Sequence, residues 1–136
     1  MLGDFGEVLV MDWGLARISS EFPNADAVSQ SDVMGGTPAY MAPEMATGPV
    51  DQITTASDIY LLGAILFEIV TRSPPHSGKT VMACLFAAAK NKFVETTETG
   101  ELMDIAMRAM ATQPADRYAT VQEFQAAVRQ LSLIHI

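Results

Sequence analysis

Basic residues and cysteine are scarce in this sequence, and each shortage excludes a class of protein. Eight Lys and Arg residues against 16 Asp and Glu give a net charge of −8, and no basic cluster marks a nucleic-acid interface. The acidic surface is typical of an ordinary hydrated protein, although it would also suit basic peptide substrates. Cys84 is the only cysteine, so no disulfide can form within the chain, and a cytoplasmic location is expected.

Long apolar runs are also missing. The longest, residues 59–70, is interrupted by Glu68 and is too short to cross a bilayer, so no membrane segment is expected in this chain. Acidic residues Asp4 and Glu7 stand near the start, where a secretory signal peptide would carry basic residues. What is present is 136 residues, of which 49% are hydrophobic, enough for one packed domain.

The start of the chain predicts a short β-hairpin. Residues 8–11 form an apolar run typical of a buried strand, and the glycine-bearing stretch 3–7 is typical of a turn whose partner strand ends at Leu2. A polar stretch, residues 19–36, follows and predicts a mobile loop. At the other end, residues 132–136 depart from the preceding amphipathic pattern, and we expect a non-native tail left by cloning.

Helical patterns fill the rest of the sequence. Thr55 and Asp58 are predicted to cap the first helix, and Pro74 ends it. Its interior is apolar nearly all round, which predicts a place at the centre of the core. Thr120 and Glu123 form a capping box at the start of the last helix, so the predicted fold is mainly α with a short N-terminal β-hairpin. Helices are expected over residues 55–72, 79–90, 101–111 and 120–131.

Two Asp-x-Gly tripeptides lie close together near the start. Asp-Trp-Gly at residues 12–14 follows the predicted strand directly, whereas Asp-Phe-Gly at residues 4–6 precedes it. A lone Asp-x-Gly is a common turn and carries little weight by itself. Position separates the two, because only the later tripeptide places a carboxylate at the end of a strand, and the earlier one is the turn of the hairpin.

Further blocks of distinctive composition follow in order. The first is rigid and punctuated by prolines, and it ends in Ala-Pro-Glu. The others open the first predicted helix, close it, and precede the last helix. They are Gly36-Thr37-Pro38-Ala39-Tyr40-Met41-Ala42-Pro43-Glu44, Ser57-Asp58-Ile59-Tyr60-Leu61-Leu62-Gly63, Arg72-Ser73-Pro74-Pro75-His76 and Pro114-Ala115-Asp116-Arg117-Tyr118.

In this order the blocks resemble the activation segment and C-terminal lobe of a eukaryotic-type serine/threonine protein kinase, over residues 1–131. The likeness is greatest to bacterial kinases whose Asp-Phe-Gly motif has Trp in place of Phe. The resemblance implies a partial kinase domain, whose complete family fold has two lobes of α+β type. It also implies transfer of the γ-phosphoryl group to Ser or Thr of a protein substrate, with ATP and Mg²⁺ as cofactors.

The resemblance assigns roles to individual residues. Asp12 matches the carboxylate that holds Mg²⁺ against the ATP phosphates, and Trp13 and Gly14 would be structural. Thr37 matches a residue that supports the catalytic loop, the alternative being a simple turn hydroxyl. The peptide substrate would be received by Gly36, Thr37, Pro38, Ala39 and Tyr40.

Other assignments concern the scaffold. Glu44 is expected to form a buried ion pair with Arg117, and Asp58 to hydrogen-bond the catalytic-loop backbone while also serving as a helix-start carboxylate. His76 is expected to pack in the fold and not to act as a base. Phosphorylation of the polar loop would order it through Arg side chains, the alternative being unmodified serines. The candidate phosphosites are Ser19, Ser20, Ser29 and Ser31.

Several kinase elements do not occur in the sequence. The glycine-rich loop, the strand lysine and the catalytic loop with its base Asp all lie upstream in the family. The isolated chain is therefore expected to be inactive, with apolar surface exposed around Leu2 and Met11 and with the missing N-terminal lobe of its parent as a partner. The alternative is a pseudokinase or a docking module that uses the 79–90 helix, but the retained Asp12 favours an active parent.

Overall fold

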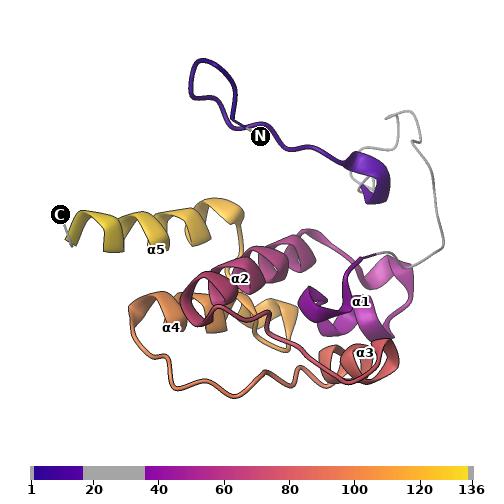
Figure 1. The fold of residues 1–136 in the computed structure, drawn as a ribbon. Helices are drawn as coiled ribbons and strands as arrows, with labels where there is room; N and C mark the ends of the chain where they lie inside the picture. Colours follow the sequence, from indigo (N-terminus) through magenta and orange to yellow (C-terminus); the bar gives the residue numbers. More distant parts are fainter. Residues whose placement is uncertain (1, 17–35, 135–136) are drawn as a thin grey trace. The chain divides into compact units, whose positions relative to one another are not determined.

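The computed structural model describes residues 2–16 and 36–134 (Figure 1). The chain divides into two compact units, Met1–Gly35 and Gly36–Ile136, and each is described by itself. The described residues form α-helices, short 3₁₀ turns and loops, with no strand among them. The mainly α fold expected from the sequence is confirmed.

The first unit contains a tight turn in place of the predicted β-hairpin. Leu2 and Val8 form a single antiparallel bridge, and the Gly3 N–H donates to the Glu7 carbonyl at 2.8 Å. Residues 8–11, predicted as a buried strand, are exposed. The prediction of a hairpin is therefore wrong, because two short strands are marginal in water unless a third strand or a helix covers them.

The second unit contains all of the helices that the sequence predicted, close to their expected bounds. The longest is α2, and α5 continues through residues 132–134, where the sequence predicted the start of a tail. No helix in the described part of the chain is long and apolar enough to cross a bilayer. The helices are α1 (Pro43–Thr47), α2 (Thr55–Thr71), α3 (Val81–Ala89), α4 (Glu101–Ala109) and α5 (Val121–Ile134). The 3₁₀ turns are η1 (Trp13–Leu15), η2 (Pro38–Tyr40), η3 (Val50–Gln52) and η4 (Pro114–Asp116).

The cap of helix α2 lies one residue earlier than predicted. Thr54, not Thr55, is the N-cap, and its hydroxyl accepts a main-chain N–H of the first turn at 3.2 Å. Ser57 completes the capping box by accepting the Thr54 N–H at 3.2 Å. Asp58 lies in the first turn, where the helix dipole favours a carboxylate, but it is not half of the cap. Two adjacent threonines made the register of the cap ambiguous in the sequence.

The core of the second unit lies between α2 and α4, which pack side by side (Figure 1). Their contact is close because Gly63 has no side chain. A Cβ placed on Gly63 would lie 2.6 Å from the Ala109 Cβ and 3.0 Å from the Met110 Cγ. The largest apolar contributors to this core are Ile59, Tyr60, Leu66, Phe67, Met103, Ile105, Met110 and Tyr118.

We expect Gly63→Ala to lower the free energy of unfolding. The added methyl group must push α2 away from α4, and such overpacking costs about 1–3 kcal/mol, more than the roughly 1 kcal/mol gained in helix propensity. Urea denaturation of the two proteins measures the difference. Gly14→Ala is the control, because its added Cβ would meet only the Asp12 carboxylate at 3.6 Å. An unchanged or raised midpoint in Gly63→Ala would show that the two helices are not tightly packed.

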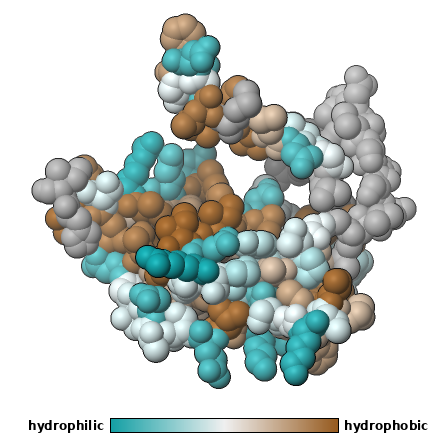
Figure 2. All heavy atoms as spheres, viewed as in Figure 1, coloured by the Kyte–Doolittle hydropathy of each residue, from teal (hydrophilic) through white to brown (hydrophobic). Residues whose placement is uncertain are grey.

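Helix α2 lies in the core, as its apolar pattern predicted, and Tyr60 and Phe67 are fully buried in it. Among the described residues, however, one face of α2 is uncovered, because Ile65 and Ile69 are 51% and 68% exposed. The helical pattern shows which positions are apolar, but not which of them a neighbouring element covers. Figure 2 shows apolar side chains gathered over α2 and α5 beside this face. A shallow groove there is lined by Leu62, Val121, Phe124, Gln125, Val128 and Arg129.

Candidate functional site

The Asp-Trp-Gly tripeptide forms a sharp turn in the first unit. Asp12 has a left-handed backbone, with φ 64° and ψ 66°, and it begins η1. This conformation is uncommon for residues other than glycine, although Asp tolerates it better than most. The Trp13 indole N–H donates to the Val10 carbonyl at 3.0 Å, which closes the turn from the other side. Both the Asp12 side chain and the Trp13 ring are exposed to solvent.

The chemistry of Asp12 fits one ligand of a magnesium ion. Its carboxylate makes no capping hydrogen bond to η1, and carboxylate oxygen is the donor that Mg²⁺ prefers. Among the described residues, no group of three or more His, Cys, Asp or Glu side chains gathers around a common point. Mg²⁺ in phosphoryl-transfer sites is usually held by one or two carboxylates together with substrate phosphates, so a single carboxylate here is compatible with such a site.

The Asp-Phe-Gly tripeptide at residues 4–6 lies in a different setting. It forms the turn that joins Leu2 to Val8, as the sequence predicted, and the Gly6 N–H donates to the Gly3 carbonyl at 3.1 Å. Gly6 has φ 80°, which glycine adopts without strain. Only the sequence of the tripeptide, Asp-Phe-Gly, would suggest Asp4 as a magnesium ligand.

The segment Gly36–Glu44, called the anchored segment below, begins the second unit. Its exposure falls steadily along the chain: Gly36 and Thr37 are exposed, η2 is half-buried, and Met41 to Glu44 are buried. Gly36 has φ 134°, a value that favours glycine, and Pro38 occupies the first position of η2. The segment therefore presents its first residues to solvent while its last residues hold it in the core.

Helix α2 and the chain after it hold the middle of the anchored segment. The Tyr40 hydroxyl donates to the Glu68 carboxylate at 2.7 Å, and this hydrogen bond raises the pKa of the Tyr40 phenol. The Ala39 carbonyl accepts the His76 main-chain N–H at 3.0 Å. Glu68, which interrupts the apolar run of α2 in the sequence, is therefore a partner of the anchored segment.

A buried ion pair holds the end of the anchored segment. Two guanidinium nitrogens of Arg117 donate to the two carboxylate oxygens of Glu44 at 2.6 and 2.9 Å, the bidentate geometry that makes such pairs strong. Glu44 and Arg117 are only 7% and 3% exposed. Ser57 donates its hydroxyl to Glu44 at 2.8 Å, and Arg117 also donates to the Ala56 carbonyl at 2.9 Å. The ion pair predicted from the sequence is formed.

The surroundings of Glu44 hold its carboxyl in the charged form. Burial by itself raises the pKa of Glu44, but hydrogen bonds from Arg117, the main chain and Ser57 bring the pKa below its ordinary value. A buried carboxylate is stable only when it is paired and hydrogen-bonded in this way. The network therefore fixes the position of α1 relative to the start of α2 and to η4.

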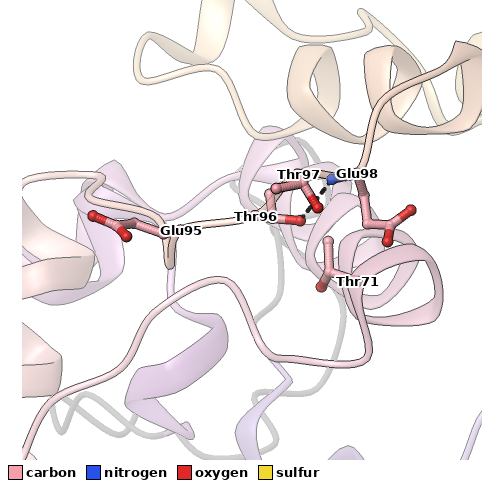
Figure 3. A pocket seen from close by; sticks show the side chains of 5 residues that line it. All are labelled: Thr71, Glu95, Thr96, Thr97 and Glu98. Carbon is pink, nitrogen blue, oxygen red and sulfur yellow. Dashed lines mark hydrogen bonds between the residues drawn. The ribbon is translucent and has the colours of Figure 1, made fainter.

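A hollow elsewhere in the second unit does not add to this site. It lies between the end of α2 and the chain that precedes α4 (Figure 3). The Thr71 hydroxyl is already committed to main-chain carbonyls of Phe67 and Ser73, and the Thr96 hydroxyl accepts the Glu98 N–H at 3.1 Å. The hollow is open and is lined by Thr71, Glu95, Thr96, Thr97 and Glu98.

Comparison with protein families matches residues 1–131 to the protein kinase domain. The chain belongs to the protein kinase family. It is 34% identical over 97% of its length to the probable serine/threonine-protein kinase PknB of Corynebacterium glutamicum. It is 33% and 30% identical, over 93% of its length, to the serine/threonine-protein kinases PknB of Mycolicibacterium smegmatis and Mycobacterium tuberculosis. The chain spans only about a fifth of the length of these relatives, 21% and 20%.

These comparisons confirm the resemblance to bacterial serine/threonine kinases that the motif blocks indicated. Of the kinase motifs, Asp-Trp-Gly lies in the first unit, and the anchored segment with the blocks that follow it lies in the second. Asp58 is exposed in the first turn of α2, and Thr37 precedes η2 without a capping hydrogen bond from its side chain. The candidate phosphosites lie outside the described residues; they are Ser19, Ser20, Ser29 and Ser31.

The sequence did not predict several of the residues that hold the anchored segment in place. Ser57 carried no predicted role, yet it is buried and bonds Glu44. Tyr60, inside an apolar helix, bonds His76 at 2.7 Å. The available signal was the polar groups of Ser57, Tyr60 and Glu68, which lie in a helix whose residues are mostly apolar.

Proposed function

We propose that this chain is the C-terminal-lobe part of a serine/threonine protein kinase that transfers the γ-phosphoryl group of ATP to Ser or Thr of a protein substrate. The observation that carries the proposal is the anchored segment, which exposes Gly36 and Thr37 while the Glu44–Arg117 ion pair holds its other end. A substrate-binding segment needs this combination, because the peptide must reach exposed backbone whose position does not change. Membership of the kinase family and the order of the motifs support the same activity.

In this proposal each motif has a defined task. Asp12 would hold Mg²⁺, which neutralises charge on the phosphates during transfer, and ATP would bind through it. Gly14 would follow Asp12 in the turn η1, and Trp13 would take the place that Phe has in the family. Thr37 would support the catalytic loop, and Asp58 would hydrogen-bond the backbone of that loop. The peptide would lie along Gly36, Thr37, Pro38, Ala39 and Tyr40.

Regulation and location follow from the same proposal. Phosphate on a loop serine would pair with Arg side chains and order the loop before the anchored segment. We place the kinase in the cytoplasm, where ATP is supplied. The candidate serines are Ser19, Ser20, Ser29 and Ser31.

Phosphoryl transfer needs parts that this sequence does not contain, so we expect the 136-residue chain alone to be inactive. The test compares the chain with a complete protein that carries it, using Mg-ATP and a basic Ser/Thr peptide. The complete protein should label the peptide on Ser or Thr, and the chain alone should give no labelling above the blank. If the isolated chain labels the peptide, the expectation that it is inactive is wrong. If the complete protein does not label the peptide, the kinase proposal is wrong.

The second candidate function is a pseudokinase or docking module. Helix α3 favours it, because Val81, Met82 and Phe86 are exposed on a helix that an interaction partner could cover. The exposed carboxylate of Asp12 favours catalysis, since a docking module has no use for a magnesium ligand. The same labelling experiment separates the two functions, because a docking module binds its partner without consuming ATP.

A further inference from the structure

His76 is a buried side chain that the proposed reaction does not use. His76 is 0% exposed, and its ring stacks between the rings of Tyr60 and Phe93 at centroid distances of 6.2 and 5.6 Å. Both ring nitrogens have partners: Nε2 lies 2.7 Å from the Tyr60 hydroxyl, and Nδ1 lies 2.8 Å from the Lys92 carbonyl. A buried imidazole with both nitrogens bonded has a fixed position and orientation.

The partners of His76 determine which nitrogen carries its hydrogen. A carbonyl can only accept, so the hydrogen of the neutral ring is on Nδ1, facing Lys92, and Nε2 accepts from Tyr60. The Tyr60 hydroxyl also donates to the Asn91 side-chain oxygen at 2.6 Å. Asn91 cannot turn its amide round, because its nitrogen donates to the Met110 carbonyl at 3.0 Å. The Tyr60 hydroxyl therefore shares its single hydrogen between two nearby acceptors, Nε2 of His76 and Oδ1 of Asn91.

The main chain of the same residue holds the anchored segment. The His76 N–H donates to the Ala39 carbonyl in η2, and the neighbouring Pro75 carbonyl accepts the Val94 N–H at 2.8 Å. The ring and the main-chain N–H belong to one residue, so a ring that cannot move fixes the direction of the N–H. We propose that His76 is a positioning residue, whose ring, locked as the Nδ1–H tautomer between Lys92 and Tyr60, holds Ala39 and with it the substrate-facing part of the anchored segment. This inference rests on the proposed function.

Burial favours the neutral form of the ring. Burial lowers the pKa of His76, and hydrogen bonds to the main chain of Lys92 and Met41 oppose that shift only in part. Added acid would place a hydrogen on Nε2 and a positive charge in the core. The folded protein takes up this proton less readily than the unfolded chain does, so stability is lost as the pH falls below the ordinary histidine pKa of about 6.5.

Among residues 2–16 and 36–134, no anion faces the ring to offset such a charge. Tyr60 faces it from α2 with a hydroxyl whose pKa burial raises well above its ordinary value. The loop after α3 presents a carbonyl, an amide and the ring of Phe93, and the anchored segment presents main chain. Arg117 lies over the Tyr60 ring, with Cζ 5.0 Å from its centroid, and Glu44 is committed to Arg117. The hold on Ala39 should therefore weaken on acidification.

Hydrogen exchange of the whole chain tests the positioning role without any kinase assay. His76→Phe keeps a ring but removes both polar contacts, and the amide of residue 76, bonded to Ala39, should exchange about tenfold faster, the effect of losing one net hydrogen bond. His76→Asn, which can keep the donor to Lys92, should exchange at an intermediate rate. The Gly48 amide, bonded to the Glu44 carbonyl, is the internal reference and should not change. Equal exchange of residue 76 in all three proteins would overturn the proposal.

Nitrogen NMR tests the tautomer in the unaltered site, in case His76→Phe does not fold. The sequence has two histidines, so His135→Gln leaves the His76 ring as the single imidazole signal. At pH 7.5 Nδ1 should be protonated and Nε2 bare, and the ring should titrate at a lower pH than in the same protein unfolded in urea. A protonated Nε2 at pH 7.5, or equal titration in the two states, would overturn the proposal. Because neither experiment reads activity, a failed kinase assay would reject the proposed function and leave these results standing.

Discussion

Arg117→Ala should lower the free energy of unfolding by about 3–5 kcal/mol, because removing one partner leaves the other as an unpaired buried charge. Glu44 would keep only Ser57 and main-chain donors. The lost guanidinium also leaves the carbonyls of Ala56 and Ala111 without the hydrogen bonds that it makes at 2.9 Å. Urea denaturation measures the loss. Arg129→Ala, on the exposed side of α5, is the matched control and should change stability by less than about 0.5 kcal/mol.

The pH dependence of the same variant identifies the charge responsible. In the unaltered protein the pKa of Glu44 is lowered, so its contribution to stability is present above the unfolded value of about 4.3 and is lost as the pH falls through the folded pKa. In Arg117→Ala only Ser57 and the main chain oppose the effect of burial, so the pKa of Glu44 should be higher than in the unaltered protein. The difference in stability between the two proteins should therefore shrink as the solution is acidified through this range. A difference that is constant with pH would show that lost packing, and not the buried charge, causes the destabilisation.

The ion pair also illustrates how far the sequence could predict this fold. Residues 44 and 117 are 73 positions apart, and no local pattern relates them. Their pairing was predicted because the blocks around them resemble a kinase, and the structure places the two side chains together. The helices, in contrast, followed from apolar spacing and from prolines within the sequence itself.

What the sequence could not predict depends on contacts between distant residues. The apolar run at residues 8–11 reads as a strand, but a strand needs neighbours, and the described residues pair it only through one bridge. In α2, the polar groups of Tyr60 and Glu68 are explained only by their hydrogen bonds. Tyr60 bonds His76, and Glu68 accepts from Tyr40. Ile65 has the same hydrophobicity as the buried Ile59, and only the packing of α4 distinguishes them. The apolar periodicity therefore predicted where the helices lie in the sequence, but only the tertiary contacts show which face of each helix is buried.

The proposed magnesium site allows a test in which one tripeptide serves as the control for the other. In a complete protein that carries this chain, Asp12→Asn should lower the rate of phosphoryl transfer by a factor of about 10²–10³ or more. The amide keeps the size of the side chain but loses the charge that binds the metal, and metal stabilisation of the transition state is worth several kcal/mol. Asp4→Asn makes the same chemical change in the tripeptide that spells Asp-Phe-Gly, and it should leave the rate within about threefold.

The two variants show whether the metal ligand is Asp12 or the Asp4 of the Asp-Phe-Gly tripeptide. Asp12 has a left-handed backbone after an apolar run, whereas Asp4 lies in a turn closed by the Gly6-to-Gly3 hydrogen bond. Raising the Mg²⁺ concentration should partly restore Asp12→Asn, because a weakened site fills at higher metal concentration. If Asp4→Asn were the damaging change and Asp12→Asn the neutral one, the assignment of the metal ligand would be reversed. Equal small effects would mean that neither carboxylate holds the metal, and circular dichroism of both variants confirms that the comparison is between folded proteins.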